Sequence, residues 1–138
     1  MVIRAVLALS CTAFGGCSGP ARVPPLPDFA EVTRVVVIRD SRDTLVILTD
    51  STRIGALVRF VNGRNAKWER SWVGIPVPQV NAYFYGSTFQ GSFGAGSSSF
   101  ETQRAGTFAS RSAEEPDLLE FARLLGVSRT AFERSASR

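Results

Sequence analysis

Histidine is missing from this 138-residue chain, and cysteine occurs only twice, at Cys11 and Cys17. Without histidine, the Ser-His-Asp and Cys-His nucleophile systems are excluded, and so is the usual general base near pH 7. Ordinary zinc sites also lose one of their two preferred ligand types. We therefore expect a non-enzymatic protein that carries no metal or other cofactor.

A disulfide framework is not expected either, because the residues after Cys17 contain no thiol and cleavage of a leader before Cys17 would leave that cysteine alone. The roughly 120 residues after Cys17 can bury about two-thirds of their unfolded surface, which is enough for one independent domain. Its own hydrophobic core must therefore hold this domain together.

Lysine is equally scarce, since Lys67 is the only lysine among 16 basic residues. Removal of Arg4 with a cleaved leader leaves 15 basic against 12 acidic residues, a net charge of +3. No basic run exceeds two residues. A small positive net charge without a basic stretch gives no reason to expect nucleic acid as a partner.

The apolar run at the N-terminus is too short to span a membrane. It follows Arg4, extends from Ala5 to Leu9 and continues weakly to Phe14, whereas a spanning helix needs about 20 apolar residues. A positive charge followed by a short apolar region is typical of a signal peptide. We assign residues 1–16 to this leader.

The leader ends in Phe14-Gly15-Gly16-Cys17, which resembles the lipobox of bacterial lipoproteins. The resemblance implies cleavage before Cys17, lipidation of Cys17 and a membrane attachment in the bacterial cell envelope. Ser18 after the cysteine resembles the sorting pattern for the outer membrane in enteric bacteria, with the domain facing the periplasm. Cleavage after Ala13-x-Gly15 is the alternative, and it gives a secreted or periplasmic soluble protein.

Four prolines lie between Ser18 and Pro27. They forbid a helix and favour an extended polyproline II segment of about 3.1 Å per residue. We predict that residues 17–28 form a lipidated tether of about 30 Å, or a disordered tail if Cys17 carries no lipid.

The folded domain is predicted to cover residues 29–126. Two β-branched runs, residues 33–38 and 44–49, surround the polar residues 39–43 and predict a hairpin. Their apolar residues are continuous, so both strands are expected to be central or covered on both faces.

A helix should follow the hairpin. Asp50 is a good N-cap, Ile54, Leu57, Val58 and Val61 form one apolar stripe, and Asn62-Gly63 predicts a left-handed stop. Residues 64–78 form an irregular loop with both tryptophans.

Four short segments with period-two patterning then predict an antiparallel meander with phenylalanines on its buried face and with Asn81, Tyr83 and Tyr85 on the opposite face. A second helix is predicted from Pro116 to Leu125, with a capping box at Ser112 and a stop at Gly126. The polar tail, residues 127–138, is expected to be frayed or loosely helical. The order ββαββββα predicts an α+β two-layer sandwich, with two helices on one face of an antiparallel sheet of about six strands.

This arrangement over residues 29–126 resembles small bacterial envelope lipoproteins of unknown function. The features that carry the resemblance are the hairpin, the Asp-capped helix ending in Val-Asn-Gly, the tryptophan loop, the aromatic meander and the final Leu-Leu-Gly. The resemblance implies no activity.

Acidic and glycine-rich groups have structural interpretations. Asp40 and Asp43 suit a hairpin turn, and Glu114, Glu115 and Asp117 suit a helix N-terminus. Residues 91–96 suit a hairpin rather than a phosphate loop, because a strand and not a helix follows.

Aromatic and cationic residues gather in and after the long loop, and such residues are enriched at interface hot spots. The candidate binding surface comprises Trp68, Trp72, Tyr83, Tyr85, Arg64, Lys67 and Arg70. Alternatively, the tryptophans are lids on the core. The sequence predicts a non-catalytic envelope protein that binds or shields an envelope protein or cell-wall component, with a carboxylate-dependent hydrolase as the alternative.

Overall fold

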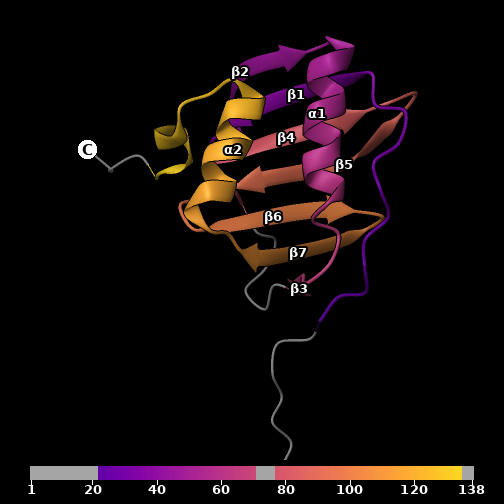
Figure 1. Ribbon diagram of the computed structural model, residues 1–138, viewed down its shortest axis with the longest axis vertical. Helices are drawn as coiled ribbons and strands as arrows, with labels where there is room; N and C mark the ends of the chain where they lie inside the picture. Colours follow the sequence, from indigo (N-terminus) through magenta and orange to yellow (C-terminus); the bar gives the residue numbers. More distant parts are fainter. Residues whose placement is uncertain (1–21, 71–76, 135–138) are drawn as a thin grey trace, which may run out of the picture.

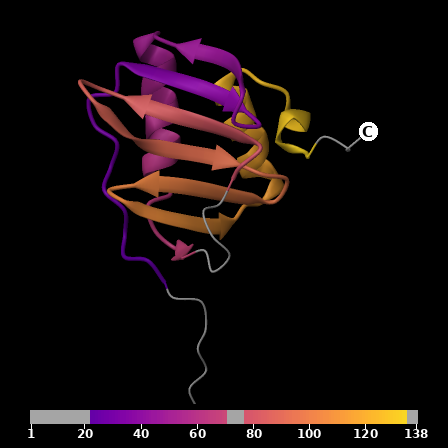
Figure 2. The ribbon, with the colours of Figure 1, turned by 180° about the vertical axis from the view of Figure 1, so that it is seen from behind.

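A seven-stranded antiparallel sheet carries two helices on one face and leaves the other face without helices (Figures 1 and 2). The computed structural model describes residues 22–70 and 77–134. The predicted α+β fold with two helices on one face of an antiparallel sheet is thereby confirmed. Cys17, the leader and Trp72 lie outside the described residues. No helix in the described ranges is long and apolar enough to cross a membrane.

The strands lie in the order β2-β1-β4-β5-β6-β7-β3. In chain order the elements are β1 (Arg34–Arg39), β2 (Asp43–Leu48), α1 (Ser51–Asn62), β3 (Glu69–Arg70), β4 (Val80–Tyr85), β5 (Phe89–Ala95), β6 (Ser99–Arg104), β7 (Thr107–Ser112), α2 (Glu115–Leu125) and the 3₁₀ helix η1 (Arg129–Phe132). The seventh strand is β3, which pairs Glu69 with Ser110 and Arg70 with Ala109. A strand of two residues is too short to show a period-two pattern, so the sequence predicted an irregular loop at Glu69 and Arg70.

The predicted first hairpin is present, but the coverage expected for its second strand is wrong. β2 is an edge strand whose only neighbour is β1, and the pairing shifts register between Val37 and Ile38. Leu45 and Ile47 are 39% and 58% exposed. A continuous apolar run therefore did not indicate burial on both faces here.

Helix α1 begins as predicted and ends differently. The Asp50 side chain accepts a hydrogen bond of 2.8 Å from the Arg53 backbone N–H. Gly63 is right-handed, with φ −64°, so the predicted left-handed stop is wrong. The chain instead continues into one tighter turn after the helix. In this turn the Arg64 N–H donates to the Val61 carbonyl at 3.0 Å.

Helix α2 starts at Glu115, with Pro116 in its first turn, and ends at the left-handed Gly126 as predicted. The predicted capping box is wrong, because Ser112 is the last residue of β7 and Glu114 occupies the N-cap without a side-chain bond. The acidic residues do lie where a helix N-terminus favours them.

The core lies between the helices and the sheet. Its centre is a cluster of aromatic rings 5.0–6.5 Å apart, comprising Phe60, Phe93, Phe100 and Phe121. Phe89 and Phe108 were also predicted to be buried, and this is wrong. Phe89 is 45% exposed because the ladder shifts register between Phe84 and Tyr85, and Phe108 lies on the helix-free face.

The domain extends beyond its predicted limits at both ends. Leu26 and Phe132, assigned to the tether and the tail, are 7% and 0% exposed. The Val23 N–H bonds the Trp68 carbonyl and the Leu26 N–H bonds the Asn65 carbonyl, each at 2.9 Å. Figure 2 shows this N-terminal segment running past the strand ends along one side of the sheet.

Candidate binding pocket on the helix-free face

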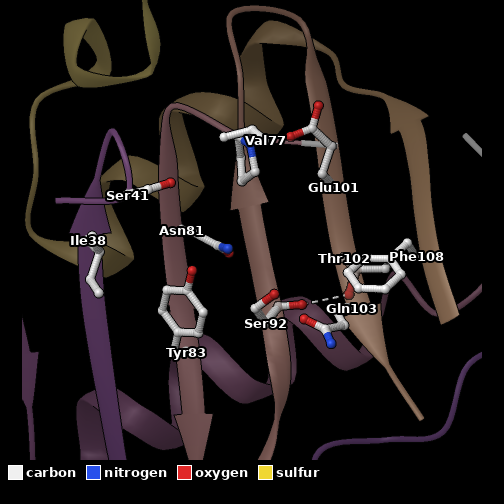
Figure 3. A pocket seen from close by; sticks show the side chains of 11 residues that line it. Ile38, Ser41, Val77, Asn81, Tyr83, Ser92, Glu101, Thr102, Gln103 and Phe108 are labelled. Carbon is white, nitrogen blue, oxygen red and sulfur yellow. Dashed lines mark hydrogen bonds between the residues drawn. The ribbon is translucent and has the colours of Figure 1, made fainter. Parts of the chain in front are cut away.

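A hollow of about 190 Å³ opens on the helix-free face of the sheet. Its floor consists of two rows of paired residues that cross the strands (Figure 3). One row is Tyr83, Ser92, Gln103 and Phe108. The other is Ile38, Asn81 and Glu101, and between the last two lies Gly94, which is covered by Pro78. Strand alternation explains this placement, because the residues between them, such as Ala82 and Phe93, face the helices.

Small residues on β5 make the hollow. Ser92 separates the taller Tyr83 and Gln103 in its row, so the floor is low at that point. Gly94 allows Pro78 to approach the sheet, since a Cβ at Gly94 would lie 2.4 Å from the Pro78 Cγ atom. Val77 and Pro78 thus form one wall of the pocket.

Two buried oxygen atoms in the pocket lack hydrogen-bond donors within the described part of the chain. They are Oδ1 of Asn81 and Oε2 of Glu101. The other carboxylate oxygen of Glu101 accepts a long bond of 3.4 Å from the Ser99 hydroxyl. Buried acceptors are normally satisfied, and an unsatisfied one costs about 1–3 kcal/mol. These atoms therefore mark a place where donors from outside the domain would be stabilising.

The electrostatics of the pocket are dominated by Glu101. Burial raises the pKa of its carboxyl group above the ordinary value, and the Ser99 hydrogen bond partly opposes this shift. Glu101 is the only charged side chain among the described residues that line the pocket. The aromatic rings of Tyr83 and Phe108 lie on opposite sides of the polar floor (Figure 3). Such a site can hold a ligand through hydrogen bonds and ring contacts.

Trp68 requires a correction, because it is a core residue and cannot belong to a binding surface. Its side chain has no exposed area. The indole Nε1–H donates to the Arg64 carbonyl at 2.6 Å, and the ring meets Phe93 edge-on at 5.7 Å. The core-lid alternative therefore describes Trp68.

The two tyrosines lie on the helix-free face, as predicted, but only Tyr83 lines the pocket. Tyr85 instead stacks under the Arg34 guanidinium at 4.6 Å and contacts Phe89 at 5.5 Å. The candidate surface is therefore only partly assembled on this face.

The predicted cations lie elsewhere. Arg64 and Lys67 line a second hollow with Arg111, near the end of α1. Arg64 forms a 2.6 Å salt bridge with Asp117, and its guanidinium lies 3.5 Å from the centre of the Phe60 ring. Arg64 thus joins α1 to α2. Arg70 is exposed on the short edge strand β3, outside both hollows.

The acidic residues at the start of α2 and the glycine-rich residues of β5 have structural roles. Glu115 pairs with Arg129 at 2.8 Å, just as Asp117 pairs with Arg64. Residues 91–95 are strand and lead through a turn into β6, so they form no phosphate loop. No group of three potential metal-ligating side chains occurs among the described residues.

Sequence reasoning missed most of the pocket. Asn81 was placed beside the tyrosines, but Ser92, Glu101 and Gln103 were not proposed for a site, and Phe108 was expected on the buried face. A usable signal was present, because each lies at a position that alternates with a buried residue in its strand. Which of these side chains meet depends on strand register, which the sequence does not state.

Compared with known proteins, the chain matches no family model, no curated protein and no solved structure. Its resemblance to small envelope lipoproteins therefore stays a prediction from the residues quoted above. The geometry of the pocket has to support any functional proposal.

Proposed function

We propose that this chain is an exported envelope protein, anchored to the membrane by a lipid on Cys17, whose domain binds a ligand without catalysis. The leader and its lipobox-like end support the location. The binding role is supported by the pocket on the helix-free face. In this proposal the outer membrane carries the anchor, and the domain faces the periplasm.

The observation that carries the binding role is the pair of unsatisfied acceptors in one pocket, Asn81 Oδ1 and Glu101 Oε2. A stable domain gains little by burying such atoms unless a donor meets them in the functional state. At about 190 Å³ the pocket is smaller than typical drug-sized sites. It suits a small molecule, or one end of a larger envelope component.

The hydrolase alternative has less support. A glycosidase of the common type uses two carboxylates on either side of the scissile bond. Among the described residues that line the pocket, Glu101 is the only carboxylate. The pocket accordingly favours binding over this chemistry.

The proposal is tested with a variant whose new side chain fills the pocket while the rest of this face of the sheet is unchanged. Ser92→Phe places a ring on the pocket floor, whereas Ser112→Phe places the same ring on the same face at an exposed position outside the pocket. A collection of small polar molecules is screened by ¹⁵N–¹H NMR against the native chain and both variants.

Molecules that bind should shift resonances of the pocket rows in the native chain and in Ser112→Phe, but not in Ser92→Phe. Unfolding curves show whether each variant is folded. The proposal fails if no molecule binds, or if Ser92→Phe binds equally well.

A further inference from the structure

The pocket carboxylate has no cationic partner in the described structure. The pKa of Glu101 responds to burial and to the Ser99 hydroxyl, with no contribution from a charged neighbour. Three more exposed acidic side chains do form ion pairs, namely Asp117 with Arg64, Glu115 with Arg129 and Glu120 with Arg123. Carboxylates that are largely removed from water are normally paired. Among residues 22–70 and 77–134, none supplies a cationic partner for Glu101.

The second unsatisfied acceptor lies across the pocket from the first. Asn81 on β4 and Glu101 on β6 both pair with Gly94 on the strand between them. Their backbones are therefore two strand spacings apart, about 9–10 Å. Figure 3 shows the Asn81 amide directed toward the middle of the pocket and Glu101 at its upper end, beside Val77. One elongated small molecule can span the distance between these two strands.

The remaining lining suits a cation as well. Tyr83 and Phe108 present aromatic rings on the two sides of the floor, and a cation within about 6 Å of an aromatic ring face is attracted by its quadrupole. Ser41, Ser92 and Gln103 are neutral. No described residue that lines the pocket carries a positive charge that would repel a cation.

From these observations we infer that the ligand is a small organic cation with a primary ammonium group that binds Glu101 and a second donor that binds the Asn81 side-chain oxygen. This inference rests on the proposed function, because it names the ligand class of the same pocket. The ammonium group replaces the missing cationic partner of the carboxylate. The second donor fixes the direction in which the molecule lies.

A matched pair of probes separates charge from hydrogen bonding. 5-Aminopentan-1-ol and pentane-1,5-diol have the same length and a donor at each end, and they differ in one ammonium group. Binding of each to the purified mature chain is followed by ¹⁵N–¹H NMR titration at pH 7 and low salt. The aminoalcohol should bind at least about tenfold more tightly than the diol, since charge-assisted hydrogen bonds are roughly twice as strong as neutral ones.

Variants then assign the difference to named atoms. Glu101→Gln keeps the shape and removes the charge, and it should abolish the preference for the aminoalcohol. Asn81→Leu removes the second acceptor and should weaken both probes. Glu114→Gln, an exposed acid outside the pocket, is the charge-matched control and should change neither affinity.

The outcomes distinguish the two proposals. Equal binding of both probes in the pocket would overturn the ammonium inference and leave the binding role standing. A preference for the aminoalcohol that persists in Glu101→Gln would also overturn it. If neither these probes nor any molecule of the screen binds the pocket, both proposals fail.

Discussion

The side chain of Asn62 makes two hydrogen bonds to the backbone of Phe29. Its oxygen accepts from the Phe29 N–H at 2.9 Å, and its amide donates to the Phe29 carbonyl at 3.0 Å. Asn62 is the last residue of α1, so it fastens the incoming N-terminal segment to the end of this helix. The Phe29 ring can then stack on Phe84, with ring centres 4.2 Å apart.

Asn62→Ala should therefore destabilise the domain. Two partly buried backbone groups lose their partners, which predicts a fall of about 1–3 kcal/mol in the free energy of unfolding. Urea denaturation measures it. Asn62→Asp retains an acceptor for the Phe29 N–H, but it sets a carboxylate oxygen against the Phe29 carbonyl at the C-terminal end of α1, so it should also lower the stability. Equal stability of Asn62→Ala and the native chain would contradict the role given to this side chain.

Trp68→Ala should lower stability strongly, because the buried ring leaves a cavity. Comparable truncations of large aromatic residues cost about 3–5 kcal/mol. Phe89→Ala is the matched control and should cost less than Trp68→Ala, since Phe89 is 45% exposed whereas Trp68 is fully buried. Thermal and urea unfolding of the two variants provide the comparison. A small effect at Trp68 would restore it as a candidate surface residue.

The pH dependence of stability should report the burial of Glu101. Because its pKa is raised above 4.5 in the folded domain, the folded state binds this proton more tightly than the unfolded state does. The resulting stabilisation is complete below the unfolded pKa and is lost as the pH rises through the folded pKa. The native chain should therefore lose stability relative to Glu101→Gln as the pH rises from below 4.5 toward neutrality.

The quantity to compare is the difference in the free energy of unfolding between the native chain and Glu101→Gln. Tyr83, the other titratable group in the described pocket lining, is common to both. Glu115 and Glu120, whose pKa values are lowered by hydrogen bonds from Arg129 and Arg123, act in the opposite direction in both. Urea unfolding over this pH range gives the difference, and a constant value would refute the predicted burial effect.

Cys17→Ser tests the expected anchor. If Cys17 is acylated, the native protein should fractionate with membranes and require detergent for extraction, and its intact mass should include the lipid. The variant should be soluble after export, or remain uncleaved. An unmodified mass for the native protein, together with unchanged fractionation of the variant, would exclude lipidation at this residue.

Local sequence patterns predicted correctly those helices and strands that are determined by residues close together in the chain. The stripe beginning at Ile54 and the cap at Asp50 determined α1, and Gly126 ended α2. The alternation in β4 also placed Tyr83 and Tyr85 opposite the core. Each of these features can be predicted from the spacing of apolar residues and from the residue at the end of the element.

The wrong predictions concern residues whose burial depends on segments that are distant in the sequence. Trp68 lies in an irregular stretch, and its burial depends on Phe93 and on the N-terminal segment. The exposed Phe89 follows a shift in the ladder between β4 and β5 that its own strand does not reveal. The pocket likewise depends on the register of several strands and on the contact between Pro78 and Gly94.

The N-terminal segment also determines how the domain would bear tension. Residues 22–29 run antiparallel to residues 62–69, with contacts between Arg22 and Glu69, Val23 and Trp68, Leu26 and Asn65, and Phe29 and Asn62. A pull along this segment from the N-terminal side loads all four contacts together, whereas a pull away from the sheet breaks them in turn, beginning at Arg22. A domain held by its N-terminus would thus resist an axial load with its whole first segment, while a sideways load would peel that segment off and uncover Trp68.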